Sequence, residues 1–199
     1  MSLTADSPFC ALLLQHIEQR ITLNEEEKQY FCSLLSLSTV LPRQFLLQQH
    51  EVCRYESYVC QGAFRSFYVD NQGAEHTLHF AWDDWWIADL TSFLNQVPAT
   101  RNIVALQKSV VLQLAHGKRE ELLRELPVFE KFWRILNERA CMAQDQRLLQ
   151  GISLSGAERY EALLRTYPTI EQRIAQKHIA SFLGITPVFL SQIRRGRAT

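Results

Sequence analysis

The sequence predicts an α+β fold, in which a β-rich region is followed by a long helix and then by a pair of short helices. Three observations support this prediction. Residues 39–115 are rich in β-branched and aromatic residues, residues 129–143 carry an apolar helical seam, and residues 174–197 have helix-turn-helix spacing. The 199 residues, 47% apolar and 21% charged, have an ordinary globular composition.

The N-terminal segment predicts two helices. Apolar residues recur at helical spacing between residues 9 and 17, and again between residues 30 and 35. Leu23 and the acidic run after it are typical of a helix start, because acidic residues favour the first turn. We therefore expect helices over residues 9–37.

The next region predicts short antiparallel strands. Residues 64–69 and 75–80 read as two strands, and Asp-Asn-Gln-Gly at 70–73 reads as the hairpin turn between them. Two further strands are expected at 103–106 and 109–115. Short strands at this spacing are typical of an antiparallel sandwich or barrel.

A long helix follows Pro127, and its apolar seam needs a partner. The seam residues are spaced four, three, four and three apart, as in a coiled coil; they are Phe129, Trp133, Leu136, Ala140 and Ala143. One interpretation is a homodimer interface along this helix. The other is packing against the chain's own β region, which Phe132 favours by broadening the seam. We favour the dimer and expect these five residues to line it.

The last two helices have the spacing of a helix-turn-helix. Ile179, Ala180 and Leu183 give the first helix one apolar face, and Gly184 suits a left-handed C-cap. Thr186-Pro187 then supplies an N-cap hydroxyl and a first-turn proline for the second helix. A further helix, with a Ser155…Glu158 capping box, precedes the pair and ends at Pro168.

The charge distribution supports a DNA-binding hypothesis. The formal net charge is zero, yet residues 151–199 hold seven basic and three acidic residues, and the rest of the chain holds 14 basic and 18 acidic residues. A locally basic segment attracts phosphates. We expect these residues to contact DNA: Lys177, Thr186, Val188, Phe189, Ser191, Gln192, Arg194, Arg195 and Arg197.

No pattern in the sequence indicates an enzyme or a cofactor. The five cysteines form no CxxC pair, so we expect reduced thiols in a cytoplasm rather than a zinc site or disulfides. His76 and His79 lie three apart on a strand, which is poor metal-ligand spacing. No signal peptide, membrane-spanning run or spaced catalytic triad is recognisable.

Over essentially the whole chain the sequence resembles the Crp/Fnr superfamily of transcription regulators, above all the short members typical of Bacteroidetes. Residues 59–94, 158–168 (ERYEALLRTYP) and 179–194 (IASFLGITPVFLSQIR) carry the resemblance. It implies a cyclic-nucleotide-binding-like jelly-roll sensor over 1–126, a dimerisation helix over 127–150, and a winged-helix DNA-binding domain over 151–199.

The chain departs from the family's cyclic nucleotide site. In members that bind cyclic nucleotides, a Gly-Glu pair holds the ribose and an arginine holds the phosphate. The resemblance places Asp89 near the glutamate position and Ala99 at the arginine position, with Arg101 two residues away. We therefore expect no cyclic AMP binding. Trp85, Trp86, Asp89 and Arg101 remain a candidate effector pocket, with core filling as the alternative for the tryptophans.

The sequence thus predicts a homodimeric, non-enzymatic, sequence-specific transcription regulator without a cofactor. Its expected partners are a palindromic DNA operator, an unidentified small-molecule effector and RNA polymerase, but no membrane. The alternative is a ligand-sensing or scaffold protein of the same fold that lacks specific DNA recognition. The family usually has a glutamate where Val188 stands and an arginine where Gln192 stands, which keeps this alternative open.

Overall fold

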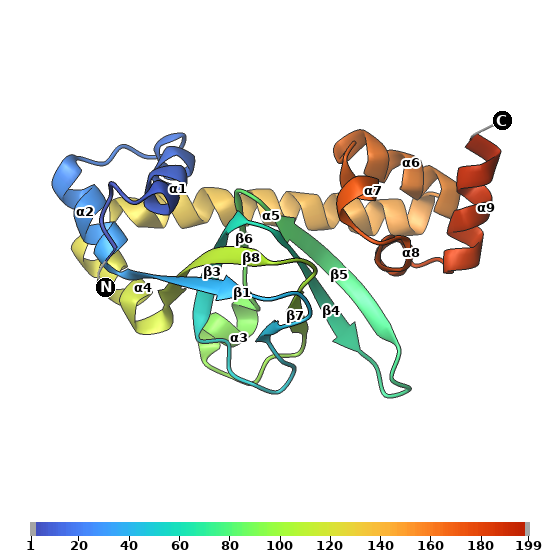
Figure 1. Cartoon of the computed structure of the whole chain (residues 1–199), viewed down its shortest axis with the longest axis horizontal. Helices are drawn as coiled ribbons and strands as arrows, with labels where there is room; N and C mark the ends of the chain where they lie inside the picture. The colour runs from blue at the N-terminus through green and yellow to red at the C-terminus, as the bar shows by residue number, and fades with distance from the viewer. Residues whose placement is uncertain (1–2, 198–199) are drawn as a thin grey trace. The chain divides into compact units, whose positions relative to one another are not determined.

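The computed structural model describes the backbone of residues 3–197 and the side chains of residues 3–196 (Figure 1). The helices are α1 Pro8–Glu18, α2 Glu25–Ser33, α3 Leu90–Asn95, α4 His116–Glu125, α5 Val128–Ser153, α6 Gly156–Thr166, α7 Ile170–Arg173, α8 Gln176–Leu183 and α9 Pro187–Arg197. The strands are β1 Leu35–Val40, β2 Phe45–Leu47, β3 Tyr55–Gln61, β4 Ala63–Val69, β5 Glu75–Trp82, β6 Trp85–Ile87, β7 Asn102–Ala105 and β8 Ser109–Ala115.

Contacts divide the chain into two compact units. The first contains the chain up to Ser66 together with Phe80–Asn137, and the second contains Phe67–His79 together with the chain from Glu138 onward. These units differ from the expected ranges 1–126, 127–150 and 151–199, because α5 contributes residues to both. The second unit also includes the tip of the hairpin formed by β4 and β5.

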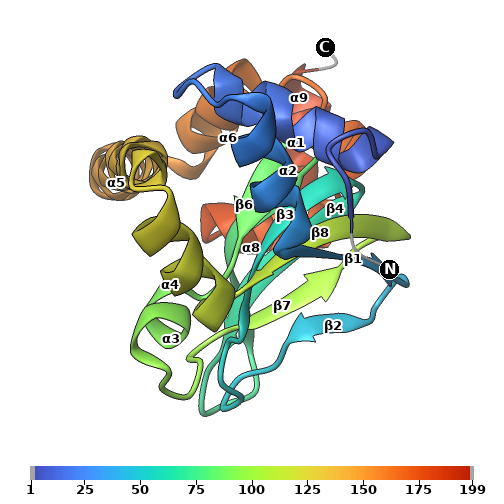
Figure 2. The ribbon, with the colours of Figure 1, turned by 90° about the vertical axis from the view of Figure 1, so that its left-hand side faces the viewer.

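Two antiparallel four-stranded sheets form the β region, as the sequence predicts. One has the order β1-β8-β3-β6 and the other the order β2-β7-β4-β5. Figure 2 shows β2 lying beside β7, whose pairing is antiparallel. The expectation of helix through residue 37 is wrong, because β1 begins at Leu35 and pairs with β8 along its length. A neighbouring strand thus overrides the local helical spacing.

Side chains alternate between two apolar clusters along the strands of the first sheet. On β3, Tyr58 packs with residues of α1, α2 and α5, whereas Val59 packs with residues of the second sheet. On β8, Leu112 and Val111 divide in the same way. This alternation follows from the two-residue period of a strand. The sheet therefore has a core on each face.

Gly62 allows β3 to turn directly into β4. Its φ of +120° is rarely adopted by other residues, and a Cβ there would collide with the side chain and backbone of Ser109. Ser109 also donates its hydroxyl hydrogen bond to the Gln107 carbonyl at 2.9 Å. Backbone conformation and space both require glycine at this position.

The seam residues at the start of α5 pack inside their own unit. Phe129, Phe132 and Trp133 are 0%, 0% and 4% exposed and belong to the cluster that also holds α1 and α2. Leu136 packs against the same cluster. Expecting Phe129 and Trp133 to anchor a dimer is therefore at odds with the structure, since their apolar surface is already covered, and Leu136 is partly covered in the same way. Ala140 and Ala143 are exposed.

Glu56 is a buried carboxyl group with two polar partners. The Arg119 Nε lies 3.0 Å from its Oε2, and the Trp133 Nε1 donates a hydrogen bond to the same oxygen at 3.1 Å. Burial raises the pKa of the Glu56 carboxyl to about 7, against the opposing effects of Arg119 and Trp133. The folded protein therefore holds a proton here at a pH where the unfolded chain has released it.

This raised pKa predicts a pH-dependent contribution to stability. Because the folded state binds the proton more tightly, the contribution is fully present below pH 4.5 and is lost as the pH rises to about 7. The size is about 3 kcal/mol. We expect Glu56→Gln to remove this decline from the free energy of unfolding, measured by denaturant titration between pH 4.5 and 8. The exposed control Glu130→Gln should keep the decline, and parallel pH profiles for both variants would contradict the assignment.

Candidate nucleic-acid interface

Helices α8 and α9 are joined by a tight turn at Gly184, between the two segments that the sequence predicts to be helical. Gly184 adopts the left-handed conformation with φ 66° and ψ 35°, and its amide bonds to the carbonyls of Ala180 and Ser181. The Ile185 amide also donates to the Ala180 carbonyl at 3.0 Å. These bonds satisfy carbonyls at the end of α8 that lack helical partners. Ala180 and Leu190 are both fully buried.

Thr186 begins α9 as an N-cap. Its hydroxyl oxygen accepts a hydrogen bond from the Phe189 amide at 3.1 Å, and its carbonyl accepts from the Leu190 amide at 3.0 Å. Val188 is 67% exposed, and both Gln192 and Arg195 are exposed. These three side chains share one face at i, i+4 and i+7. The second helix thus buries Leu190 and leaves the predicted reading face open to solvent.

The other predicted DNA contacts differ in their surroundings. Lys177 on α8 is exposed, Phe189 is 43% exposed and Ser191 is half-buried. The Arg194 Nε lies 2.8 Å from Glu171 Oε1, which also accepts a hydrogen bond from the Tyr160 hydroxyl at 2.5 Å. Arg194 is therefore already paired within the chain. The Arg197 side chain lies outside the described residues.

Helix α6 supports the turn between α8 and α9. Its N-terminus has the predicted capping box, in which Ser155 and Glu158 each bond to the other's backbone amide. A Cβ at Gly156 would lie 2.8 Å from Ile185 Cγ2, so only glycine permits this close approach. Arg159 donates hydrogen bonds to the carbonyls of Leu183 and Leu154 at 3.1 and 2.8 Å. The first of these bonds attaches α6 to the end of α8.

The tip of the β4–β5 hairpin holds α8 within the second unit. The Ser181 hydroxyl donates to the Glu75 carbonyl and accepts from the Thr77 amide, both at 2.9 Å. Ser181 thus bonds to the backbone of β5 as a neighbouring strand residue would. Sequence reasoning missed this contact, since a serine on a helix does not indicate which backbone it will bind.

Arg147 on α5 joins the same hairpin to α8. Its guanidinium donates to the carbonyls of Leu78, of Thr77 (3.2 Å) and of Phe182 (2.9 Å). Its Cζ lies 3.9 Å from the centre of the Phe182 ring, a cation–π contact. One planar cation therefore bonds to three carbonyls from two segments. Sequence analysis did not single out Arg147 either.

No β-wing accompanies the helix-turn-helix in the part of unit two between residues 138 and 197. All regular elements there are helices, namely the end of α5 and α6 to α9. The winged helix that the resemblance implies therefore stays a prediction, and within these residues α8 and α9 contact α6 and the β4–β5 hairpin.

The four candidate effector residues lie in the first unit, and two of them bind each other. Asp89 is 1% exposed, and its carboxylate accepts hydrogen bonds from the amides of Ser92 and Thr100 at 3.2 Å each. The Arg101 Nε lies 3.3 Å from the same carboxylate. Trp86 packs against the helix-side cluster and Trp85 against the inter-sheet cluster. Asp89 caps α3 and neutralises Arg101, while the tryptophans line core clusters.

Large apolar side chains are exposed along the part of α5 that belongs to the second unit. Met142, Leu148, Leu149 and Ile152 are 62%, 64%, 65% and 78% exposed. Met142 and Leu149 are seven residues apart, and Ile152 follows three residues later, as in a coiled-coil seam. An apolar patch of this kind marks an interaction surface.

The described residues provide no metal site and no membrane-spanning helix. No group of three or more His, Cys, Asp or Glu side chains in residues 3–196 is arranged to hold an ion. Within the same described part, no helix is both long and apolar enough to cross a bilayer.

Solved structures of similar fold match most of the chain. FixK2 from Bradyrhizobium japonicum has a TM-score of 0.69 at 15% identity, over 81% of this chain and 83% of its own. The c-di-GMP-responsive global regulator CLP from Xanthomonas campestris has a TM-score of 0.67 at 10% identity, over 88% and 92%. A cyclic nucleotide-binding domain from Methylobacillus flagellatus has a TM-score of 0.61 at 18% identity, over 74% and 86%.

At these identities the likeness shows the fold alone. The first unit has the fold of cyclic-nucleotide-binding domains, and the chain as a whole is similar in fold to bacterial regulators. No family model matches the sequence. No curated protein matches it either.

The contacts of Arg147 predict that its loss will loosen α8. Arg147→Met removes three charge-assisted hydrogen bonds and leaves the carbonyls without this donor, at a cost of about 2–4 kcal/mol. We expect amide hydrogen exchange at Ser181 and Phe182 to accelerate, while exchange in β3 and β8 stays unchanged. Arg139→Met, an exposed change on the same helix, is the control. Unchanged protection of α8 in the Arg147 variant would show that these bonds do not hold the helix.

Proposed function

We propose that the chain is a non-enzymatic, sequence-specific DNA-binding transcription regulator of the Crp/Fnr type. The observation that carries this proposal is the pair α8 and α9, in which Leu190 is buried while Val188, Gln192 and Arg195 remain exposed on one face. A helix presented in this way fits the major groove of DNA. The fold similarity to a global regulator of gene expression agrees with the proposal.

Gln192, in the middle of the exposed face, is the residue that we expect to contact a DNA base. A glutamine amide can bond to adenine N6 and N7 together, and Val188 or Phe189 can pack on a thymine methyl group. We therefore expect half-sites that have A·T pairs at the central contacts. Thr186, Lys177 and Arg195 are free to approach phosphates, since the N-terminus of α9 also offers backbone amides.

In this proposal, two copies of the chain dimerise through α5 and together recognise a palindromic DNA site. The interface we propose uses the exposed residues Met142, Leu149 and Ile152 rather than the buried aromatic residues near its start. The exposed Ala140 and Ala143 lie on other sides of the helix. Burying Met142, Leu149 and Ile152 against a second copy removes them from water, which favours association. Two copies then present two α9 helices to two half-sites.

The sensor unit, in this proposal, does not use cyclic AMP. Asp89 already neutralises Arg101, and Ala99 occupies the position expected for a phosphate-binding arginine. A phosphate placed there would face the buried Asp89 carboxylate.

A scaffold protein without specific DNA recognition is the second candidate, and one contact favours it. Arg194 pairs with Glu171, which withdraws a cation from the DNA-facing helix. Binding measurements on genomic fragments separate the two candidates, because only a regulator selects particular sequences over bulk DNA. RNA polymerase is a candidate partner only for the regulator.

We expect Gln192→Ala to relax the preference for A·T at one position of each half-site. The loss is about 1–3 kcal/mol at that base pair and nearly none elsewhere. Binding-site selection followed by fluorescence titration measures both effects. Gln172→Ala, an exposed change outside the two-helix motif, is the control. A selected site with G·C at this position, unchanged in the Gln192 variant, would show that Gln192 does not read the base.

We expect Leu149→Asp to convert the dimer into monomers. The carboxylate would enter an apolar interface twice, once from each copy, and should weaken self-association on the order of a hundredfold. Sedimentation velocity at micromolar concentration measures the change. Gln144→Asp adds the same charge to another side of α5 and should leave the dimer intact. A monomeric unmodified protein would refute the interface.

A further inference from the structure

The first unit contains a cavity that the proposed function leaves unused. Its volume is about 440 Å³, within the range of small-molecule sites. It lies among the end of β2, the segment leading into β3, and parts of β3, β6, β7 and β8. None of the four candidate effector residues lines it, although Ile87 and Ala88, which stand between Trp86 and Asp89, do.

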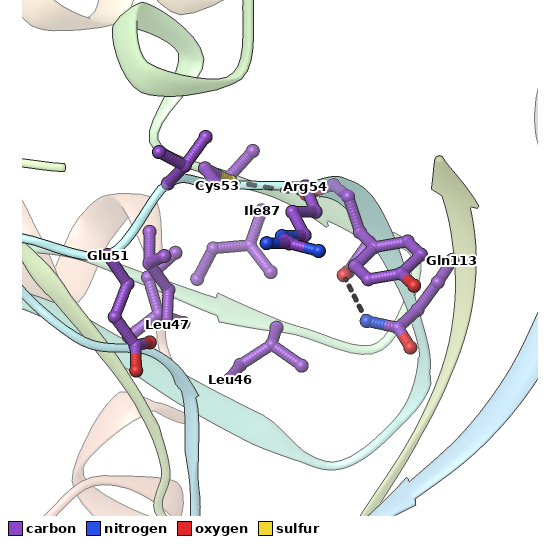
Figure 3. Close-up of a pocket in the computed structure, with 12 residues that line it drawn as sticks. Leu46, Leu47, Glu51, Cys53, Arg54, Ile87 and Gln113 are labelled. Atoms are coloured by element: carbon purple, nitrogen blue, oxygen red, sulfur yellow. Dashed lines mark hydrogen bonds between the residues drawn. The ribbon is translucent and has the colours of Figure 1, made fainter. Parts of the chain in front are cut away.

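Apolar side chains form half of the wall. Figure 3 shows Leu46, Leu47 and Ile87 around the hollow. The remaining apolar lining residues are Val52, Ala88 and Ile103. Such a wall accommodates a hydrocarbon body, since transfer of apolar surface from water into this environment is favourable.

Two polar residues, Ser57 and Gln113, interrupt the apolar part of this wall. Ser57 on β3 and Gln113 on β8 are cross-strand partners on the face that bears Val59 and Val111. The Gln113 Nε2 donates to the Ser57 Oγ at 3.4 Å. Their amide and hydroxyl groups give this part of the wall atoms that can bond to a polar ligand.

Arg54 supplies a positive charge to the cavity. Figure 3 shows its guanidinium directed into the middle of the hollow from the segment before β3. Among residues 3–196, no acidic side chain pairs with Arg54. By contrast, Arg101 and Arg119 in the same unit pair with Asp89 and Glu56. Glu51 also lines the cavity, and its carboxylate accepts a hydrogen bond from the Gln48 amide at 3.1 Å.

We propose that this cavity binds a small organic acid with an apolar body. The carboxylate of the ligand pairs with the Arg54 guanidinium, which presents two parallel N–H donors to such a group. The hydrocarbon part of the ligand lies against Leu47, Ile87 and Ile103. If the ligand carries a second polar atom, the Gln113 amide can bond to it. The proposal goes beyond DNA binding and does not depend on it.

Titration of the full-length protein with hexanoate tests the proposal. We expect saturable binding with a Kd at or below about 20 mM, as suits a ligand of so few atoms. Hexan-1-ol, with the same body and no charge, and hexylammonium, with the opposite charge, should each bind at least about tenfold more weakly. Two-dimensional NMR should show the hexanoate-induced shifts at Leu46, Leu47 and the amides of 51–55.

Arg54→Gln should weaken hexanoate binding by about tenfold or more, because it removes the guanidinium that pairs with the ligand carboxylate. The thermal unfolding midpoint should stay unchanged, because Arg54 is exposed and has no pairing partner among the described residues. Arg43→Gln removes an exposed cation that does not line the cavity and should bind hexanoate normally. No saturable binding overturns the proposal. So does equal binding of hexylammonium, an unchanged affinity in the Arg54 variant, or shifts confined to other parts of the protein.

Discussion

A helix can bury only the part of its surface that meets a partner, and α5 meets different partners along its length. Its first three turns are covered by the aromatic cluster of the first unit, through Phe129, Phe132 and Trp133. Its later turns belong to the second unit, where Arg147 binds carbonyls of β5 and α8. The covalent continuity of α5 is therefore the constraint on which both units depend, because neither could lose this helix and keep its own contacts.

The parts of the fold that follow local rules could be predicted from the sequence. Gly184, Thr186 and the Ser155…Glu158 pair satisfy backbone groups within a few residues of themselves, so spacing alone identifies them. Arg147 and Ser181 bind carbonyls and amides, which nearly every residue carries, so no pattern in the sequence could name their partners. The extent of α2 was wrong for a related reason: pairing with β8 makes residues 35–40 a strand.

The apolar seam of α5 shows why the candidate interface was harder to predict than the fold. Spacing of three and four residues indicates which side of a helix is apolar but is the same for a core contact and for a dimer. Only burial distinguishes them, and it assigns Phe129 and Trp133 to the core while leaving Leu149 and Ile152 in solvent. For the cavity, the sequence predicted the strand over 109–115 but no strand over 55–61, so the pairing of Ser57 with Gln113 and the location of Arg54 beside it required the fold.

The ion pair between the buried Asp89 carboxylate and the half-buried Arg101 guanidinium has a consequence for how these two positions can change. Asp89 also caps α3 and accepts the Thr100 amide, so its loss would disturb the loop as well as leave a guanidinium without its partner. Loss of Arg101 alone would leave the Asp89 carboxylate, which is 1% exposed, without its cationic partner. Neither single substitution is an easy step, so the two positions are expected to be inherited together.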